Sequence, residues 1–457
     1  MLSTAVILAA GKGTRMWPFT EVRNKCAIPV ANVPNVLLLA RALHEIGVSR
    51  LVVIVGYQEQ SVRHALRQIE PRPAFVVQEP NSGTAGAALA GLRLCSDERH
   101  VLLIYGDVVS TADVLADFVV AWEQSGASAG VLYDEVHPAE SGDWYAVHVH
   151  GDRCVRIVGH EAGATHRWCG AAILPTNICE VLEANPGRML SVPVGGMPPL
   201  EPDLAESIND LGAEIIAVHA EGFVVDMDKP WHILEANTRM AGHLCSSITA
   251  DVIDATATVD DSAEVAGRLV IGPRSRIGKR VQIEGNVIVG PDTVITNGAI
   301  LRGSNLVGDK TSIQDYCLIG ANSVVGSGCV VGHCAEMDGV LMDGAYLYHY
   351  CEISGVVGLS VDIGAATVCG TLRFDDGIAE HRIRGRHERP LSDANGTFFG
   401  DYCRTGVNVI TMPGTKIGAY SCVGGGIVVY EDLPSRTLLL LKQDTVARPW
   451  GPERYGW

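Results

Sequence analysis

Apolar residues follow two different patterns along the chain. Over residues 4–240, short apolar runs of strand length alternate with stretches of helical periodicity, beginning with a run at 5–9 and an amphipathic stretch at 36–46. This alternation predicts an α/β fold in which helices cover both faces of a mostly parallel sheet. Further strands and helices are expected at 51–55, 61–69, 74–78, 101–105, 129–133, 215–218 and 230–244.

Beyond residue 250 the apolar residues keep a strict six-residue period. Fourteen consecutive aliphatic residues, each six positions after the last, run from Ile253 to Val331, and glycine often follows them, as at Gly272 and Gly278. Such a repeat is typical of a β-helix, in which each hexad forms one face of a three-sided coil and coils stack about 4.8 Å apart. We therefore predict a left-handed parallel β-helix, an all-β fold, for this half.

The hexad period also marks the domain boundaries. It resumes at Val357 and Ile363 and again from Phe399, but fails over 373–397, where the charged stretch 382–389 lies. Long loops on a solenoid usually belong to a site or a subunit contact. The pattern predicts a first domain at 1–240, a linker at 241–250, a β-helix at 251–436 with a 373–397 loop, and a C-terminal tail at 437–457.

Charge and cysteine usage exclude several classes of protein. The formal net charge of −17 opposes binding to nucleic acid, so any phosphorylated substrate must be small and held by a few cations. The thirteen cysteines contain no CxxC pair, which favours free thiols in a reducing compartment. No basic flank precedes the apolar N-terminus, and no apolar run reaches membrane-spanning length. We expect a cytoplasmic protein with no membrane partner.

The first thirty residues carry the clearest candidate chemistry. A glycine-rich turn after a first strand lets backbone N–H groups approach phosphate oxygens, and a helix dipole would add positive potential. The turn is not a dinucleotide fingerprint, because Met16 replaces the third glycine, and it lacks the Gly-Lys-Ser/Thr ending of a Walker loop. It therefore indicates a phosphate loop with two cations, Arg15 and Lys25. The loop residues are Leu8, Ala10, Gly11, Gly13 and Thr14.

These residues resemble the signature of the sugar nucleotidyltransferases, which reads L-A-A-G-x-G-T-R-M-x-P followed by P-K-x-x-x-P-V. The chain keeps the loop at 8–16, Pro18, Lys25 and Pro29, with Asn24 where the family has proline. The resemblance implies a Rossmann-like nucleotidyltransferase domain. It assigns nucleotide binding to the loop and to Gln78, Gly83 and Thr84, metal binding to Asp107 and Asp226, and catalysis to Arg15 and Lys25.

The implied reaction is in-line attack of a sugar 1-phosphate on the α-phosphorus of a nucleoside triphosphate, giving an NDP-sugar and pyrophosphate. Two carboxylates would hold Mg²⁺, while Arg15 and Lys25 offset the growing negative charge. No general base is needed, because the sugar phosphate oxygen is already an anion. Asp228 lies two residues after Asp226 on the same strand face, so it is an alternative metal ligand.

The expected sugar pocket departs from the family. Many members carry a Glu-Lys-Pro whose lysine contacts the sugar phosphate, but residues 159–170 of this chain keep only Glu161 and Gly170 as candidate sugar-binding residues. The lysine is missing, and Arg167 is the candidate that replaces its charge. The sequence leaves the sugar open, and it also leaves open whether the nucleotide is UTP, dTTP or GTP.

Over its whole length the chain is most similar to archaeal-type bifunctional enzymes that make UDP-N-acetylglucosamine and use acetyl-CoA in the β-helix. The segments 372–376, 400–408 and 412–418 carry this likeness. His349 is the candidate acetyltransferase base, but it stands one residue out of the motif's register. Asp362 replaces the usual Asn and Ala366 the usual Gly.

Three readings of the β-helix and the activity remain. We prefer a nucleotidyltransferase whose β-helix serves mainly to build a homotrimer or other homo-oligomer. The second is a bifunctional enzyme that also acetylates an amino-sugar 1-phosphate. The third is a mannose-1-phosphate-type guanylyltransferase or a non-catalytic regulatory relative, and its non-catalytic form is disfavoured because Arg15, Lys25, Asp107 and Asp226 are all present.

Overall fold

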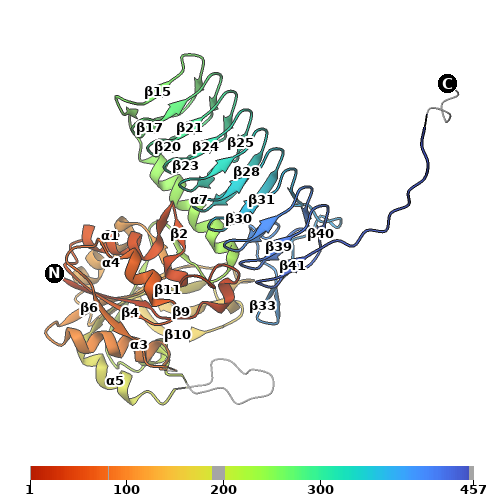
Figure 1. Ribbon diagram of the computed structural model, residues 1–457. Helices are drawn as coiled ribbons and strands as arrows, with labels where there is room; N and C mark the ends of the chain where they lie inside the picture. The colour runs from red at the N-terminus through yellow and green to blue at the C-terminus, as the bar shows by residue number, and fades with distance from the viewer. Residues whose placement is uncertain (1, 81, 188–200, 452–457) are drawn as a thin grey trace.

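The computed structural model describes residues 2–80, 82–187 and 201–451. It shows an α/β part built from the first half of the chain and a long stack of short parallel strands built from the second half (Figure 1). Residues 1, 81 and 188–200 of the expected first domain, and 452–457 of the expected tail, lie outside the described residues. No helix among the described residues is long and apolar enough to cross a membrane.

Within the described residues, the α/β part is organised around a nine-stranded sheet of order β5-β4-β1-β6-β11-β8-β12-β10-β9. These strands are β1 (Thr4–Ala9), β4 (Arg50–Val55), β5 (Ala74–Val77), β6 (His100–Tyr105), β8 (Ala129–Glu135), β9 (Tyr145–His150), β10 (Arg153–Gly159), β11 (His166–Pro175) and β12 (Ile215–His219). Two short ribbons accompany the sheet: β2 (Pro29–Val30) with β3 (Val33–Pro34), and β7 (Val108–Ser110) with β13 (Val224–Asp226).

The expected parallel sheet is present only in part. Strands β5, β4, β1 and β6 are parallel, and β8 is parallel to β12, but β11, β10 and β9 pair in the antiparallel sense. The prediction of a mostly parallel sheet was therefore wrong for the second half of the sheet. The two-residue turn at Gly151 between β9 and β10 is too short for a parallel crossover, so these strands must form a hairpin.

Helices cover both faces of the sheet, as expected. One core holds Ile7 of β1 with residues of α1, α2 and α4, and the other holds Val6 with residues of α3, α5 and α6. The alternation of Val6 and Ile7 between the two cores follows from the two-residue period of a strand. The helices are α1 (Asn35–Glu45), α2 (Glu59–Ala65), α3 (Gly83–Leu92), α4 (Ala112–Ser125), α5 (Cys179–Ala184), α6 (Leu204–Asn209) and α7 (Pro230–Ser246).

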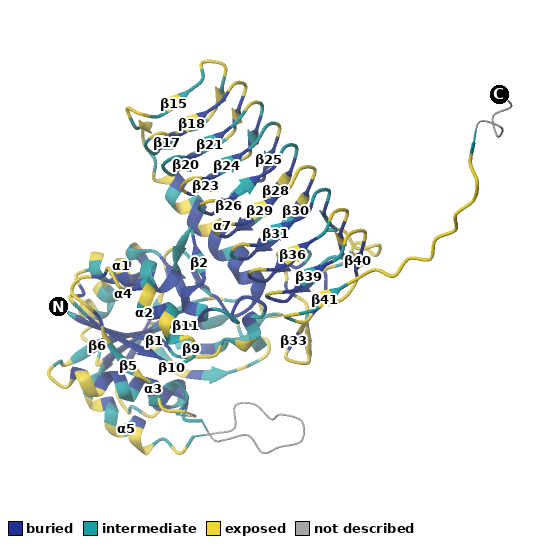
Figure 2. Cartoon of the chain, viewed as in Figure 1, coloured by how far each residue is buried: buried dark blue, intermediate teal, exposed yellow. Residues whose placement is uncertain are grey.

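The C-terminal half forms stacked coils whose strands run from β14 (Val252–Ile253) to β41 (Leu438–Leu439). Successive coils pair in parallel with a register of eighteen residues, so that Ile253 stacks on Ile271 and Ile271 on Val289. This register equals three hexads and matches a β-helix. The hexad aliphatics point inward, and Figure 2 shows dark blue strands between yellow corners.

The first coil is an exception to this burial. Ile253 is 44% exposed and Val265 38% exposed, whereas Ile271 on the next coil is 2% exposed. No coil stacks below the first one among the described residues, so its inward residues stay open to solvent at this end. Burial of every hexad position was therefore not predictable from the period alone.

The hexad period changes where the strands β28 (Glu336–Leu341) and β30 (Glu352–Val357) replace two-residue strands. These two strands are in register at sixteen residues, two fewer than the eighteen of the first coils. Each runs straight through a position where other coils turn, with Gly339 at φ +117° and Gly355 at φ +127°. A Cβ on Gly339 would lie 2.3 Å from the Gly355 carbonyl oxygen and 2.9 Å from Leu234 of α7, so the missing corner makes room for this helix.

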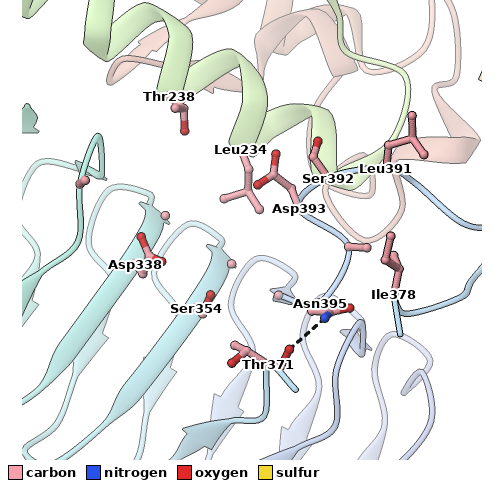
Figure 3. Close-up of a pocket in the computed structure, with 15 residues that line it drawn as sticks. Leu234, Thr238, Asp338, Ser354, Thr371, Ile378, Leu391, Ser392, Asp393 and Asn395 are labelled. Atoms are coloured by element: carbon pink, nitrogen blue, oxygen red, sulfur yellow. Dashed lines mark hydrogen bonds between the residues drawn. The ribbon is translucent and has the colours of Figure 1, made fainter. Parts of the chain in front are cut away.

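Between β32 (Val368–Cys369) and β35 (Thr397–Phe399) the chain leaves the coils and forms the hairpin β33 (His381–Ile383) and β34 (Arg386–Glu388). Figure 3 shows the base of this excursion, where the Asn395 side-chain amide donates to the Thr371 carbonyl at 2.9 Å. A cavity of about 340 Å³ lies there between α7, β28, β30 and the returning chain. In Figure 1 the hairpin lies beside the α/β part.

One apolar core joins the two halves of the chain. It contains Met16 and Phe19 from the glycine-loop region, Trp231 of α7, Ile383 of the hairpin and Phe398 of the coils. All five side chains are at most 6% exposed. The stacked coils are thus packed directly against the region where the sequence places its candidate chemistry.

Candidate active site

The glycine loop begins where β1 ends and leads into a single 3₁₀ turn, Thr14–Met16. Gly13 has φ +58°, and a Cβ there would lie 3.1 Å from the Lys25 Cβ. Glycine is therefore needed both for the turn and for the close approach of Lys25. The helix dipole considered for this loop is absent, since the turn is three residues long and the chain reaches its first α-helix only at α1. Gly11 is exposed, with nothing within 4 Å of a Cβ built on it.

Asn24 fastens the Lys25 turn to the glycine loop. Its side-chain amide donates to the carbonyl oxygens of Gly11 at 3.2 Å and Tyr57 at 2.8 Å, and its oxygen accepts from the Cys26 N–H at 2.9 Å. A proline, which the resembled signature has at this position, could make none of these side-chain bonds. An Asn that caps a short turn is a recognised pattern, and it was the available signal for this role.

The two predicted carboxylates come together on the ribbon of β7 and β13. Asp107 precedes β7, and Asp226 ends β13, where it pairs with Val108 in the antiparallel register. The Met227 N–H also donates to the Asp107 carbonyl at 3.2 Å. The ribbon therefore holds Asp107 and Asp226 side by side, although 118 residues separate them.

Lys25 sits against these carboxylates. Its ammonium forms an ion pair with Asp107, and its side chain is only 20% exposed. Burial alone would lower the pKa of Lys25, but the carboxylates of Asp107, Asp226 and Asp228 outweigh burial and raise this pKa. Lys25 is therefore a permanent cation at the end of the glycine loop.

Arg15 pairs with Asp228, the alternative metal ligand. The guanidinium NH2 lies 2.9 Å from Asp228 Oδ1, and the two side chains are 34% and 7% exposed. Burial would raise the pKa of Asp228, but Arg15, Lys25 and Lys229 together lower it, so this carboxyl is ionised. Asp226 has the opposite behaviour, since burial and the nearby Asp107 charge raise its pKa to about 7.

The residues present fit a hard divalent cation. Asp226 Oδ1 and Asp228 Oδ2 are both buried without a hydrogen-bond partner, which leaves carboxylate oxygens for a metal ion. Across the described residues, no group of three or more His, Cys, Asp or Glu side chains is gathered tightly enough to hold a metal ion by itself. This matches Mg²⁺, which commonly takes one or two protein carboxylates and completes its shell with water and phosphate oxygens.

Gln78 follows β5 and faces the loop before α3. Its amide nitrogen donates to Ser82 Oγ at 3.0 Å and to the Gly83 carbonyl at 2.7 Å. Gly83 has φ +58°, and a Cβ there would lie 2.2 Å from the Pro202 oxygen. Thr84 Oγ1 accepts from the Leu204 N–H at 2.9 Å. The three predicted base-reading residues are thus adjacent and tied to the start of α6.

The two predicted sugar-binding residues lie in different surroundings. Gly170 is buried in β11 with φ +70°, and a Cβ there would meet the Tyr105 ring at 3.0 Å, next to the Asp107 turn. Glu161 is partly exposed, and its carboxylate contacts His148 Nε2 at 2.7 Å. Gly170 lies beside the carboxylate cluster, whereas Glu161 contacts His148 instead.

Arg167, the proposed substitute for the missing lysine, is largely buried. Its NH2 donates to the Val224 carbonyl at 2.5 Å and lies 3.4 Å from Asp134, and its guanidinium stacks over the Trp144 ring. Val224 begins the strand that carries Asp226, so Arg167 is bound to this strand rather than projecting freely into solvent.

His349 lies on the coils, in the turn after β29 (Tyr346–Leu347), and is exposed. Its ring meets Tyr350 edge-on with centroids 5.3 Å apart. Its carbonyl accepts from the Ala366 N–H of the next coil at 3.0 Å. His349 is therefore separate from the residues clustered around Asp107.

Lys229 is the residue of this region that sequence reasoning missed. Its side chain is 1% exposed, and its ammonium lies 3.1 Å from Asp143, 2.5 Å from Glu388 and 3.8 Å from Asp228. Its position between Asp228 and Pro230, where α7 begins, is visible in the sequence. Its pairing with Glu388 of the hairpin is not visible there.

The chain is similar to several known proteins. Residues 5–184 match the model of the MobA-like NTP transferase domain. The "Bifunctional protein GlmU" of Methanococcus maripaludis strain C7 is 28% identical over 453 residues, covering 97% of this chain and 98% of that protein. The "Bifunctional sugar-1-phosphate nucleotidylyltransferase/acetyltransferase" of Sulfurisphaera tokodaii is 26% identical, covering 94% of this chain and 98% of that protein.

Matches to solved structures cover about half of the chain. The structure titled "UTP-bound UGPase from acinetobacter baumannii" covers 53% of this chain and 94% of its own, with 18% identity and a TM-score of 0.45. The resemblance predicted from the signature residues is confirmed by the family model and by the full-length relatives.

Proposed function

We propose that this chain, whose residues 5–184 form an NTP transferase domain, is a sugar-1-phosphate nucleotidyltransferase that releases pyrophosphate as it makes an NDP-sugar. The observation that carries the proposal is the meeting of Lys25, Arg15, Asp107, Asp226 and Asp228 at the end of the glycine loop. Cations beside a carboxylate pair are the groups that phosphoryl transfer requires.

Each residue then has one role. The backbone of the loop at Leu8, Ala10, Gly11, Gly13 and Thr14 receives the triphosphate, while Gln78, Gly83 and Thr84 receive the base. Arg15 and Lys25 offset charge on the α-phosphoryl group and the departing pyrophosphate. Asp107 and Asp226 would hold Mg²⁺. Bound there, this ion would supply positive charge shared by the nucleotide and sugar phosphates.

Arg15 and Lys25 must exchange partners during binding. In the structure they neutralise Asp228 and Asp107, and phosphate oxygens would take over from these carboxylates as substrate enters. The freed carboxylate oxygens then face the same space as the phosphates. Substrate binding thereby frees carboxylate oxygens that can bind the metal ion. No general base takes part in this exchange.

The substrates are tested by a panel. Full-length protein with Mg²⁺ is incubated with UTP, dTTP or GTP and one sugar 1-phosphate at a time, and pyrophosphate release is measured. One full-length relative is named a sugar-1-phosphate nucleotidylyltransferase/acetyltransferase, which supports this class of acceptor. No release with any pair would refute the proposed function.

An acetyltransferase is the second candidate. Full-length relatives carry bifunctional names, and one is named an acetyltransferase, which favours a second activity in the coils. The one-residue shift of His349 argues for weak or absent activity, and assembly remains our preferred role for this half. Robust acetyl transfer from acetyl-CoA to glucosamine 1-phosphate, abolished by His349→Ala, would overturn this preference.

Further features belong to the same proposal. We propose left-handed winding of the coils, supported by αL residues that recur at the corners, such as Arg274, Asp292 and Lys310. The division into 1–240, 241–250, 251–436 and 437–457, a homotrimer along the coil axes and a cytoplasmic location are proposed with it. Light scattering at micromolar concentration tests the trimer, and a monomer would refute it.

A further inference from the structure

Lys229 is a buried cation whose charge must be balanced by neighbouring carboxylates. A buried ammonium is strongly unfavourable unless it is paired and hydrogen-bonded. Asp143 and Glu388 lie within hydrogen-bond distance of its Nζ, at 3.1 and 2.5 Å, while Asp228 Oδ2 is farther away at 3.8 Å. Lys229 is thus held mainly by the first two carboxylates rather than by the one in the candidate active site.

Glu388 comes from the other half of the chain. It ends β34 of the excursion, 159 residues after Lys229, and its side chain is only 11% exposed. Its second oxygen, Oε1, is buried without a hydrogen bond and lies 3.5 Å from the Arg386 guanidinium. The carboxylate therefore points inward, toward the α/β part, rather than into solvent.

The hairpin that carries Glu388 is fixed against the α/β part at several points. The His381 ring lies 4.8 Å from the Trp231 ring, Ile383 joins the shared apolar core, and the Leu391 N–H donates to Glu140 Oε1 at 3.0 Å. Glu140 directly precedes the 3₁₀ turn that contains Asp143. The structure therefore presents Glu388 at a defined place beside Lys229.

Asp228 connects this group to the candidate catalytic arginine. One of its oxygens pairs with Arg15 at 2.9 Å, and the other is buried without a hydrogen bond on the side of Lys229. If the Glu388 charge were removed, the buried Lys229 ammonium would keep only one carboxylate within hydrogen-bond distance, that of Asp143 at 3.1 Å. Asp228 is the nearest ionised group that could move toward the Lys229 ammonium. That movement would break the pair between Asp228 and Arg15.

We propose that Glu388 is a positioning residue for nucleotidyl transfer in the same chain. By holding Lys229, it leaves Asp228 to orient Arg15 and keeps the second Asp228 oxygen available near Asp226. The inference rests on the proposed function. It gives the coils a role in the transferase site that is distinct from assembly.

A structural role for Glu388 would predict a different result. If the Lys229–Glu388 pair only fastened the two halves together, its loss would lower stability and leave turnover of the folded protein unchanged. If Glu388 has a positioning role, its loss should lower turnover more than stability. Turnover falls at saturating substrates, while the KM for the sugar phosphate stays nearly constant.

The test compares full-length Glu388→Gln with Glu380→Gln, a matched change on the same hairpin. Glu380 pairs at the surface with His387 and Arg389, both of which belong to the same excursion. We expect kcat for pyrophosphate release to fall about tenfold in Glu388→Gln, with KM for the sugar phosphate within about twofold. Turnover equal to that of Glu380→Gln would overturn the proposal.

A double-mutant cycle tests whether the effect passes through Lys229. Lys229→Gln removes the cation that Glu388 holds, so adding Glu388→Gln to it should lower kcat by less than about twofold further. If the two substitutions lower kcat independently, so that their factors multiply, Glu388 does not act through Lys229. The unfolding midpoints of all variants are measured alongside, to confirm that the folded protein is being compared.

A readout without turnover separates this proposal from the proposed function. Mn²⁺ binding to the substrate-free protein is followed by electron paramagnetic resonance. Glu388→Gln should weaken it at least about threefold, because Asp228, once turned toward Lys229, no longer adds its negative charge beside Asp107 and Asp226. If the wild type released no pyrophosphate with any substrate pair, the proposed function would fail and this titration alone would decide. Equal Mn²⁺ affinity in both proteins would then reject a role for Glu388.

Discussion

The buried guanidinium of Arg23 donates to the carboxylate of Asp401, so the turn that carries Lys25 is bound to the stacked coils. Arg23 is 9% exposed in its side chain and Asp401 0%. Asp401 also accepts from the Leu359 N–H at 2.7 Å, and Arg23 contacts the Met342 sulfur. The turn that carries Lys25 and the stacked coils are thus joined by a buried ion pair.

We predict that Arg23→Met destabilises the protein by about 3 kcal/mol, because it leaves the Asp401 charge buried without its partner. Urea unfolding measures this loss. Arg268→Met is the matched control, since Arg268 is 55% exposed and lies 3.8 Å from Asp251, and should change stability by less than about 0.5 kcal/mol. Equal effects of the two changes would contradict the buried pair's importance.

Lys25→Ala and Asp107→Ala should each lower turnover by at least about 10²-fold while the protein stays folded. Each change removes a charge that acts on the reacting phosphates directly or through the metal. Pyrophosphate release is the measurement, and Lys310→Ala, an exposed lysine on the coils, is the control. Normal release by either variant would rule out the assigned site.

Asp226 gives the metal-free protein a pH dependence. Burial and Asp107 raise its pKa to about 7, above the usual carboxyl value, so the folded state binds its proton more tightly than the unfolded chain does. This stabilisation is present at low pH and is lost as pH rises through about 7. We expect metal-free Asp226→Asn to exceed the wild type in stability at pH 8, measured by thermal unfolding.

Mg²⁺ should make the wild type more stable than Asp226→Asn, because a bound cation favours the ionised carboxylate. At pH 8, saturating Mg²⁺ is expected to raise the unfolding midpoint of the wild type and to leave that of Asp226→Asn nearly unchanged. If Asp228→Asn instead abolished the Mg²⁺ effect and Asp226→Asn kept it, the choice between these two ligands would be wrong.

Gly83→Ala should displace the loop that we propose to bind the base. Its Cβ would lie 2.2 Å from the Pro202 oxygen, in addition to the strain of a positive φ. Gly126→Ala is the matched control, since Gly126 has φ +67° with nothing within 4 Å of its Cβ. Both changes share the backbone strain of about 1 kcal/mol. Only Gly83→Ala should also raise the KM for the nucleotide, by about tenfold or more.

The parts of the fold that local periodicity encodes were predictable from the sequence. The strand at 5–9 and the helix at 36–46 correspond to β1 and α1, because their apolar residues already show which face is buried. The antiparallel strands β9, β10 and β11 were not predictable in this way. Their direction depends on which distant strand each one pairs with.

The candidate site was also predictable from the sequence only in part. The glycine loop, Lys25, Asp107 and Asp226 were found because the signature places them in order along the chain. Glu388 could not be found, since it is one of several charges in the stretch 382–389 and only the folded hairpin selects it. The side-chain bonds of Asn24 were missed for a related reason, because the signature treats that position as a proline.

Helix α7 sets a limit on how the coils can vary in length. The chain leaves α7 at the far end of the stack, and the coils then return along the helix, so that Cys245 contacts Asn305 and Leu234 contacts Gly339. A coil advances about 4.8 Å and a helical residue about 1.5 Å. Inserting one eighteen-residue coil before β23 (Asn305–Val307) would therefore require about three more residues in α7 to keep Glu388 and Asp401 at the site. The number of coils and the length of this helix must change together.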